Sequence, residues 1–126
     1  MAESCLLCTP QLIVLENELA YVCRDSYPVS PGHLLVVTVR HVADYFDTTE
    51  NERIAIMELV HEAKDYLVKA HSPDGFNVGV NCGTAAGQSV PHVHIHVIPR
   101  YQGDMEDPRG GVRGVIPNKQ KYHRSN

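Results

Sequence analysis

The sequence lacks the features that mark membrane, secreted and disordered proteins. Its apolar runs all stay well short of the roughly 20 residues that a membrane-spanning helix needs. The first residues, MAESCLLC, contain no basic region followed by a long apolar core, so no secretory signal is recognisable. Repeats, low-complexity runs and blocks of like charge are also missing. These absences predict a cytoplasmic protein that does not interact with membranes.

The composition is that of a chain that folds by itself. Apolar residues make up 43% of the 126 residues and charged residues 21%, which is a globular rather than a disordered profile. A chain of this length is expected to form one domain over residues 1–126. It is long enough to bury a core, yet short enough that pairing with a second copy would help to stabilise it.

The net charge of −4 conceals an asymmetry between the body of the chain and its C-terminal end. Residues 1–99 carry five Lys and Arg against twelve Asp and Glu, whereas residues 100–126 carry six against three. The simpler interpretation of this locally basic end is a solvated surface segment, and the alternative is a segment that faces an anionic ligand. A nucleic-acid groove is not predicted, because no basic patch is interleaved with aromatic residues.

Apolar runs of two lengths predict the strands. Short runs at 13–15 and 19–23 flank Asn17 and Glu18 and indicate a hairpin. The segment HLLVVTV, residues 33–39, is almost continuously aliphatic, which is typical of a central strand covered on both faces. The loop that joins this hairpin to the central strand, residues 24–33, contains two prolines and a glycine.

The pattern then changes to that of a helix. Thr49 and Glu52 form a capping box, in which each side chain satisfies a free backbone N–H at the helix start. Apolar residues spaced three or four apart form one face, namely Ile56, Leu59, Val60, Ala63 and Leu67. Pro73 ends the helix, and FNVGVN, residues 76–81, alternates as a strand does. Strands on both sides of one helix predict an antiparallel α+β domain.

Three histidines at every second position form the most informative stretch, GQSVPHVHIHVI, residues 87–98. In a strand His92, His94 and His96 point to one face, while valine and isoleucine point to the core. Successive imidazoles are then roughly 6.5–7 Å apart along the strand, so one ion is poorly held by all three. A metal site that uses a pair of them with a ligand from elsewhere stays open. An exposed strand face that is rich in histidine by chance is the plainer alternative.

The glycine loop before this strand suggests phosphate chemistry. Gly83 and Gly87 let the backbone approach a ligand closely, and the N–H groups of such a loop can hold phosphate oxygens. Beside a phosphate, one neutral imidazole can attack phosphorus while a neighbouring imidazole donates to the leaving oxygen.

The four cysteines are expected to be thiols or metal ligands rather than a disulfide framework. Cys5 and Cys8 have the spacing of a metal knuckle, but two thiolates are only half of a tetrahedral site, so histidines must supply the rest. A metal-free pair is one alternative. A redox pair is another, although it would require a thioredoxin-like βαβ context that is not predicted.

Together these motifs resemble the histidine triad (HIT) family. GQSVPHVHIHVIPR, residues 87–100, resembles the family signature, and PGHLLVVTVRHV, residues 31–42, resembles its Gly-His strand. CLLC resembles the N-terminal motif of zinc-bearing members. The resemblance implies a homodimer with an antiparallel sheet of about five strands, one long helix and a short N-terminal helix or turn. The tail at 107–126 is expected to contribute to the site or to the dimer.

The resemblance also implies a function and a site. The family binds purine nucleotides and cleaves a phosphoanhydride or phosphoramidate bond, releasing a nucleoside monophosphate. His94 would be the nucleophile, His96 would assist the leaving group, and His33 would support both. The implied substrate contacts are Asp25, Asn81, Gly87, Gln88, Ser89 and His96. The implied structural zinc site consists of Cys5, Cys8, His41 and His92.

Several alternatives to this reaction stay open. Related transferases and phosphorylases often carry Gln at the third triad position, so His96 favours hydrolysis. The segment DPRGGVRGVIP, residues 107–117, resembles the tail of bacterial and archaeal diadenosine-polyphosphate hydrolase-like members, so the resemblance implies diadenosine polyphosphates or other adenylated compounds (AMP-X) as substrates. The competing hypotheses are a nucleotidyltransferase, a hydrolase with a catalytic zinc, and a nucleotide-binding module without turnover.

Overall fold

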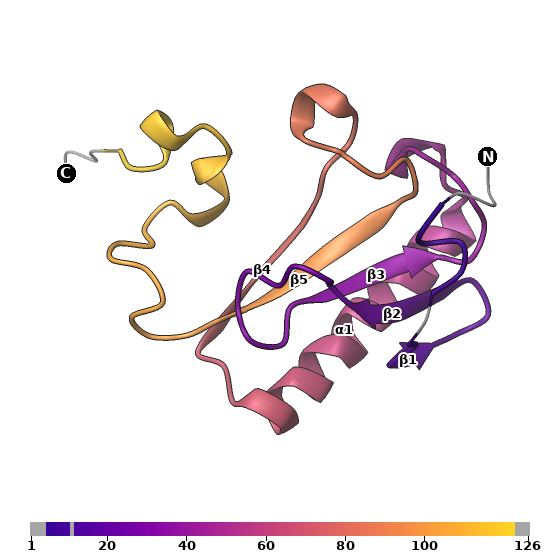
Figure 1. Cartoon of the computed structure of the whole chain (residues 1–126), viewed down its shortest axis with the longest axis horizontal. Coiled ribbons are helices and arrows are strands. Elements are labelled where there is room, and N and C mark those ends of the chain that lie inside the picture. The colour runs from indigo at the N-terminus through magenta and orange to yellow at the C-terminus, as the bar shows by residue number, and fades with distance from the viewer. Residues whose placement is uncertain (1–4, 11, 123–126) are drawn as a thin grey trace.

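Five strands form a single antiparallel sheet with one long helix across one of its faces (Figure 1). The computed structural model describes residues 5–10 and 12–122. The sheet order is β1-β2-β3-β5-β4. The elements are β1 (Leu15–Glu16), β2 (Ala20–Arg24), β3 (Leu34–Thr38), α1 (Glu50–His71), β4 (Gly75–Val80) and β5 (His94–Arg100). The predicted α+β fold is therefore confirmed, with every predicted strand within two residues of its expected position.

Short 3-10 helices complete the structure, at Tyr45–Asp47, Thr84–Ala86, Gly111–Val115 and Pro117–Lys119. Within the part of the chain that the structure describes, none of the helices has both the length and the apolar character needed to cross a bilayer.

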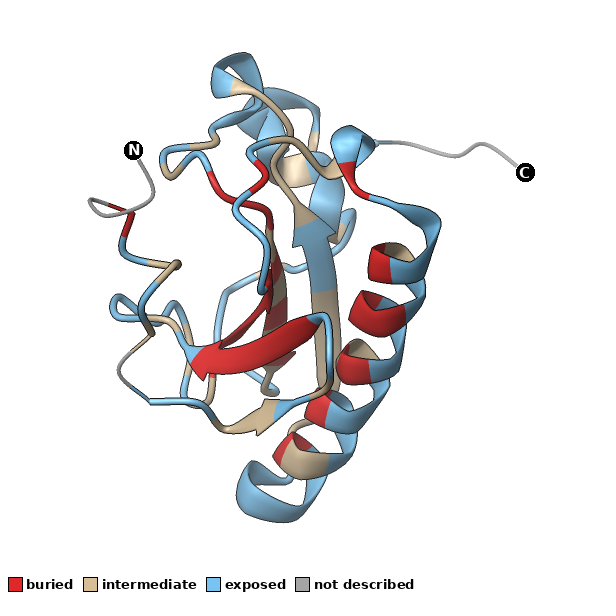
Figure 2. Cartoon of the chain, turned by 90° about the vertical axis from the view of Figure 1, so that its right-hand side faces the viewer, coloured by how far each residue is buried: buried red, intermediate tan, exposed pale blue. Residues whose placement is uncertain are grey.

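The main core lies between α1 and the sheet. Ala55, Ile56, Leu59, Ala63 and Leu67 are buried and form the stripe that faces the sheet in Figure 2. They pack against alternate residues of the three central strands: Ala20, Val22, Leu34, Val36, Ile95 and Val97. Apolar residues three and four apart on the helix thus pack against apolar residues two apart on the strands. Because Ile95 and Val97 face the helix, the alternate residues of β5 face away from it.

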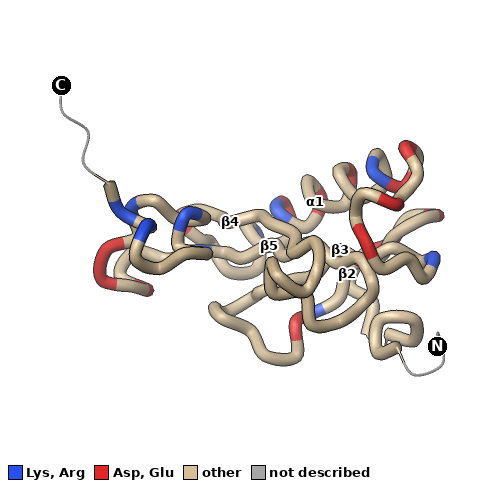
Figure 3. Tube along the Cα trace, turned by 90° about the horizontal axis from the view of Figure 1, so that it is seen from above, with Lys and Arg blue, Asp and Glu red and all other residues tan. Residues whose placement is uncertain are grey.

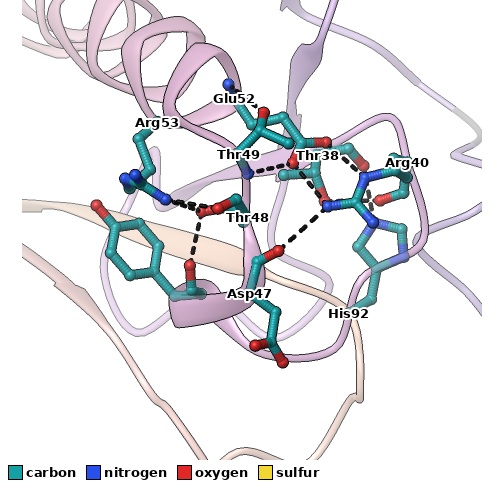
Figure 4. Close-up of polar contacts among 9 residues, drawn as sticks. Thr38, Arg40, Asp47, Thr48, Thr49, Glu52, Arg53 and His92 are labelled. Atoms are coloured by element: carbon teal, nitrogen blue, oxygen red, sulfur yellow. Dashed lines mark hydrogen bonds and ion pairs between the residues drawn. The ribbon is translucent and has the colours of Figure 1, made fainter.

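The N-terminus of α1 is held by the predicted capping box and by an ion pair (Figure 4). The Thr49 hydroxyl accepts from the Glu52 N–H at 3.1 Å, and the Glu52 carboxylate accepts from the Thr49 N–H at 2.9 Å. The same buried carboxylate receives two bonds from the Arg40 guanidinium, at 3.0 and 2.8 Å. Since Arg40 lies two residues after β3, the helix start is tied to the end of the central strand.

The second face of the sheet is covered by the N-terminal segment. Tyr21, Cys23, Leu35 and Val37 form a smaller buried cluster, and Leu7 packs against it. Residues 6–8 form a turn, so the expected N-terminal helix or turn is a turn. β3 is therefore buried on both faces, as predicted. On β5 the register places His96 opposite Leu35 and His94 opposite Val37, on this second face.

β4 is an edge strand, which modifies the predicted alternation. Phe76 and Val80 pack partly against the core, but Val78, expected on the same face, is 46% exposed. A hollow beside it is lined mainly by Val60, Phe76 and Val97. An apolar residue exposed on a free edge suits the predicted homodimer, which stays a prediction.

The basic residues at the C-terminal end of the chain make contacts within that end; Figure 3 shows Lys and Arg positions gathered there. Arg109 and Lys121 both contact the Asp107 carboxylate, at 3.1 and 3.4 Å. The Arg113 guanidinium lies 4.6 Å from the centre of the Tyr122 ring. These contacts fit a surface segment better than a segment that faces an anionic ligand. The expected contribution of this tail to the site or dimer stays a prediction.

Candidate functional site

The three histidines of the signature have different environments. β5 begins at His94, and Ile95 and Val97 are buried while His94 and His96 are half-buried on the opposite face. The His94 and His96 ring centres are 5.3 Å apart. His92 precedes the strand and is completely buried. The two strand histidines therefore form one pair, and His92 belongs to a separate cluster.

A backbone hydrogen bond decides which nitrogen of His94 is free. Its Nδ1 lies 2.7 Å from the carbonyl oxygen of His92. A carbonyl oxygen can only accept, so Nδ1 carries the proton in this contact. In the neutral ring Nε2 then keeps its lone pair, which is the state that a nucleophile requires.

His33, His96 and Asp25 form a relay beside His94. His33 Nδ1 accepts from the backbone N–H of Val29 at 3.1 Å, so its proton sits on Nε2. That nitrogen lies 2.9 Å from His96 Nδ1 and 3.4 Å from the Asp25 carboxylate. His96 accepts on Nδ1 and therefore carries its own proton on Nε2. His94 and His96 thus have opposite tautomers, one with a free lone pair and the other with a free N–H.

The side chains of Asp25, His33 and His96 are close enough together to resemble a metal site. The Val29 hydrogen bond argues against that use, because it keeps a proton on the His33 nitrogen that would have to bind the ion.

Burial keeps both histidines of the relay neutral. It lowers the pKa of His33, against an opposing and smaller effect of the Asp25 carboxylate. Burial likewise lowers the pKa of His96, with further lowering by the neighbouring imidazoles of His94 and His33. At neutral pH His96 is thus an uncharged hydrogen-bond donor.

These groups open into a cleft of about 750 Å³. Its polar lining includes five residues that the sequence predicts for the site: Asp25, Asn81, Ser89, His94 and His96. Its apolar lining includes Leu6, Leu7, Leu12, Tyr27 and Leu35. A cleft with apolar walls and a few convergent polar groups is typical of a small-molecule site. The structure therefore brings most of the predicted substrate and catalytic residues together in one place.

Gly87 and Gln88, which are also predicted to contact substrate, shape the neighbouring loop. Gly87 has a φ of 95°, a conformation that favours glycine. The Gln88 amide accepts from the Gly83 N–H at 2.9 Å and donates to the carbonyl oxygens of Ala43 and Val90, at 2.6 and 3.1 Å. Its side chain thus braces the loop, and its direct contact with phosphate stays a prediction.

A second cluster contains the four predicted metal ligands. The sulfur atoms of Cys5 and Cys8 and one ring nitrogen each of His41 and His92 all lie within 4.8 Å of one another. Cys5 Sγ lies 3.3 Å from His92 Nδ1, and Cys8 Sγ lies 3.1 Å from His41 Nδ1. Tetrahedral zinc ligands of these types lie roughly 3.3–3.8 Å apart. The donor set and its spacing therefore fit a zinc ion.

The protonation of this cluster also suits a cation. His92 Nε2 donates to the carbonyl oxygen of Thr38 at 2.7 Å, which leaves the Nδ1 lone pair facing the sulfur atoms. Burial lowers the pKa of His92 and keeps the ring neutral. Burial and the adjacent Cys5 sulfur raise the pKa of Cys8, an effect that a bound divalent cation would reverse.

Sequence reasoning missed two kinds of contributor. The backbone groups of Val29, Thr38 and His92 select the histidine tautomers, and no sequence pattern signals them. The other contributors are the apolar residues of the N-terminal turn. CLLC was interpreted through its cysteines alone, although the two leucines between them line the cleft.

Comparison with known proteins agrees with this geometry. The family model of the HIT domain matches residues 8–103. The chain belongs to the HIT family. It is similar to a Zn-bound histidine triad family protein from Mycobacterium smegmatis, with a TM-score of 0.76 and 29% identity. That match covers 85% of this chain and 82% of the other.

Two named relatives of this HIT chain are enzymes. It is 42% identical over 94 residues to the AP-4-A phosphorylase of Mycobacterium tuberculosis, covering 74% of this chain and 48% of that protein. It is 38% identical over 80 residues to the asymmetrical bis(5'-nucleosyl)-tetraphosphatase of Schizosaccharomyces pombe, covering 64% and 44% respectively. The chain thus spans about half the length of these curated relatives.

The buried relay predicts that acid destabilises the fold. Because the pKa values of His33 and His96 are lower in the folded protein than the ordinary 6.5, the unfolded chain binds more protons below that pH. The free energy of unfolding should be level above about pH 6.5 and should fall as the pH drops below it. Urea denaturation of metal-free protein at several pH values measures this.

The exposed His61 and the buried His33 provide the matched variants for this measurement. His61→Gln should keep the pH dependence, and His33→Gln should reduce it. Stability that stays level or rises on acidification would contradict the account.

Proposed function

We propose that this HIT protein binds a purine nucleotide, cleaves a phosphoanhydride bond and releases a nucleoside monophosphate through a nucleotidyl intermediate on His94. The observation that carries the proposal is the hydrogen bond from His94 Nδ1 to the His92 carbonyl oxygen, which leaves the Nε2 lone pair free beside the cleft. The opposite tautomer of His96 supports it, because a donor then stands next to the nucleophile.

In the first step, the Nε2 lone pair of His94 attacks the phosphorus of the bound nucleotide. An N–P bond forms and the bond from phosphorus to the bridging oxygen breaks, with its electron pair going to the leaving group. The Nε2–H of His96 donates a hydrogen bond to that oxygen and stabilises its developing charge. His33 holds His96 in the required tautomer, at 2.9 Å.

In the second step, water attacks the same phosphorus. The N–P electron pair returns to Nε2 of His94, the nucleoside monophosphate leaves, and one proton is released to solvent. The His92 carbonyl oxygen keeps the His94 ring in the same orientation in both steps, so the enzyme returns to its starting state without a rearrangement of the site.

The neutral state of His96 favours polyphosphate substrates. A phosphate leaving group departs as an anion and needs only a hydrogen bond, whereas an amine must also receive a proton. Because burial lowers the pKa of His96, the ring is mostly neutral at neutral pH and seldom carries an extra proton to give to an amine. The relatives named for AP-4-A and bis(5'-nucleosyl) tetraphosphate support the same class. We therefore favour dinucleoside polyphosphates over phosphoramidates.

The cleft offers a division of contacts along such a substrate. Asn81 and Ser89 lie beside the triad and suit the phosphate end, and Asp25 suits the ribose hydroxyls. The Asp25 carboxylate also lies 3.4 Å from His33, so ribose binding and the relay share one group.

Removing the nucleophile should abolish turnover. His94→Ala should lower kcat/KM for diadenosine tetraphosphate by about a thousandfold or more, because the covalent step is lost. His61→Ala, on the exposed face of α1, should be unaffected. Mass spectrometry of rapidly quenched wild type should find adenylate on His94. Equal rates for His94→Ala and wild type would refute the mechanism, and AMP binding without turnover by wild type would favour a binding module.

Phosphorolysis is the second candidate function, favoured by the relative named AP-4-A phosphorylase. Attack on the intermediate by inorganic phosphate instead of water would yield ADP instead of AMP. Product analysis in the presence of phosphate distinguishes the two: AMP indicates the hydrolase that His96 favours, and ADP indicates the phosphorylase.

We further propose that Cys5, Cys8, His41 and His92 bind one structural zinc ion. The support is the convergence of two sulfur and two nitrogen atoms within 4.8 Å and the orientation of the His92 lone pair by Thr38. When bound, the ion would supply a fixed link between the N-terminal turn and the two strand ends. His94 and His96 are not among these ligands, which separates the zinc from the chemistry.

Metal analysis tests the site directly. Protein purified without chelator should contain one zinc per chain, and the double variant Cys5→Ser with Cys8→Ser should contain none. Cys23→Ser should retain zinc, because Cys23 lies in β2 outside the cluster. Zinc retained by the double variant would contradict the assignment. Loss of kcat in proportion to zinc removal would instead indicate a catalytic metal.

A further inference from the structure

One wall of the cleft is built by the segment that carries the two cysteines. Leu6, Leu7, Thr9, Pro10 and Leu12 all line the cleft. Leu6 is 78% exposed and Leu12 is 58% exposed, although both are large apolar side chains. Apolar surface held open at the mouth of a cleft is suited to cover the flat faces of a nucleotide base.

Another set of lining residues carries the chemistry. His94, His96, Ser89 and Asn81 come from β5, the loop before it and the end of β4. They suit the phosphate, whereas the leucine wall offers no charged group. The two sets of lining residues thus suit different parts of a nucleotide, and only the apolar set belongs to the N-terminal segment.

Few contacts hold this segment on the fold. Across residues 5–10, the backbone forms one internal turn, from the Cys8 N–H to the Cys5 carbonyl oxygen at 3.2 Å. The Tyr21 hydroxyl donates to the Leu7 carbonyl oxygen, and the Leu7 side chain packs on the second face of the sheet. The remaining polar contacts are those of the cysteine sulfurs with His41 and His92. The segment is not a strand of the sheet, so the cysteines are its main attachment.

We infer that zinc bound at the four-ligand cluster holds the apolar wall of the nucleotide cleft, so that occupancy of the metal site sets the affinity for the purine base. The inference rests on the proposed nucleotide-binding function and on the proposed zinc. Two ligands come from the wall segment, and His41 and His92 come from the folded body next to β3 and β5. Structural zinc contributes folding free energy directly to the segments that it joins.

Without the ion, the coordinate bonds are lost, and only weak contacts between the thiols and the imidazoles remain. The segment would then be held by the Tyr21 hydroxyl, the Leu7 side chain and these weaker contacts of the cysteine sulfurs. Ordering it again on binding would cost ligand affinity. The histidine pair does not depend on the segment, because backbone groups at His92 and Val29 orient it.

Two probes distinguish the two sets of lining residues. AMP carries base, ribose and phosphate, and ribose 5-phosphate lacks only the base. Calorimetric titration of both into zinc-loaded and zinc-free wild type should show AMP binding about ten- to a hundredfold weaker without zinc, the range that corresponds to burial of one leucine side chain. Ribose 5-phosphate should bind equally to both forms.

Two variants make the test independent of metal removal. Leu6→Ala keeps all four ligands and alters an exposed side chain, so this variant should bind zinc normally. Its affinity for AMP should fall, and its affinity for ribose 5-phosphate should stay the same. Cys82→Ser, which changes a cysteine outside the cluster, should match wild type with both probes. Circular dichroism of each form verifies that the fold is intact.

Equal AMP affinity with and without zinc would overturn the inference. Equal weakening of both probes would also overturn it, since zinc would then support the whole fold and not the base wall. Failure of zinc-loaded wild type to bind AMP at all is a different outcome, which would refute the proposed function itself.

Discussion

Backbone groups decide which nitrogen each histidine of this site presents. The Thr38 carbonyl oxygen accepts a hydrogen bond from Nε2–H of His92, and the His92 carbonyl oxygen accepts one from Nδ1–H of His94. The Val29 N–H donates to His33 and so determines the tautomer of His33 and, through it, the tautomer of His96. Free imidazole has no strong preference between these forms, so the surrounding backbone makes chemically identical side chains into different reagents. In the proposed metal site and reaction, His92 would present a lone pair to zinc, His94 a lone pair to phosphorus, and His96 an N–H to the leaving oxygen. The proposed reaction depends on this arrangement more than on any single distance.

The arrangement is rigid because the elements that supply it are packed on both sides. β3 is buried on one face by α1 and on the other by the cluster around Tyr21 and Leu7. The Arg40 and Glu52 ion pair joins the end of that strand to the first turn of α1, close to the carbonyl group that orients His92 (Figure 4). The proposed zinc ties the remaining loose segment to the same region. The proposed metal site, the helix cap and the proposed catalytic pair thus share one support, which suits a reaction that requires positioning more than motion.

Much of the fold could be predicted from the sequence, because its signals are local. The capping box at Thr49, the spacing on α1 and the alternation on β5 each follow from neighbouring residues. The alternation also indicated that one ion is poorly held by all three triad histidines, and the structure separates His92 from the other two. The tautomers could not be predicted, since they depend on backbone groups brought together only by the sheet register. The exposure of Val78 was missed because strand order, which places β4 at an edge, is not written in the strand itself.

The central claim is that hydrogen bonds to the backbone give His94 and His96 opposite tautomers before substrate arrives. A long-range proton–nitrogen NMR correlation spectrum of the histidine side chains near neutral pH measures this directly, with single His→Gln variants to assign the signals. The account predicts a proton on Nδ1 of His94 and on Nε2 of both His96 and His33. A proton on Nε2 of His94 would leave no lone pair facing the cleft and would contradict the account.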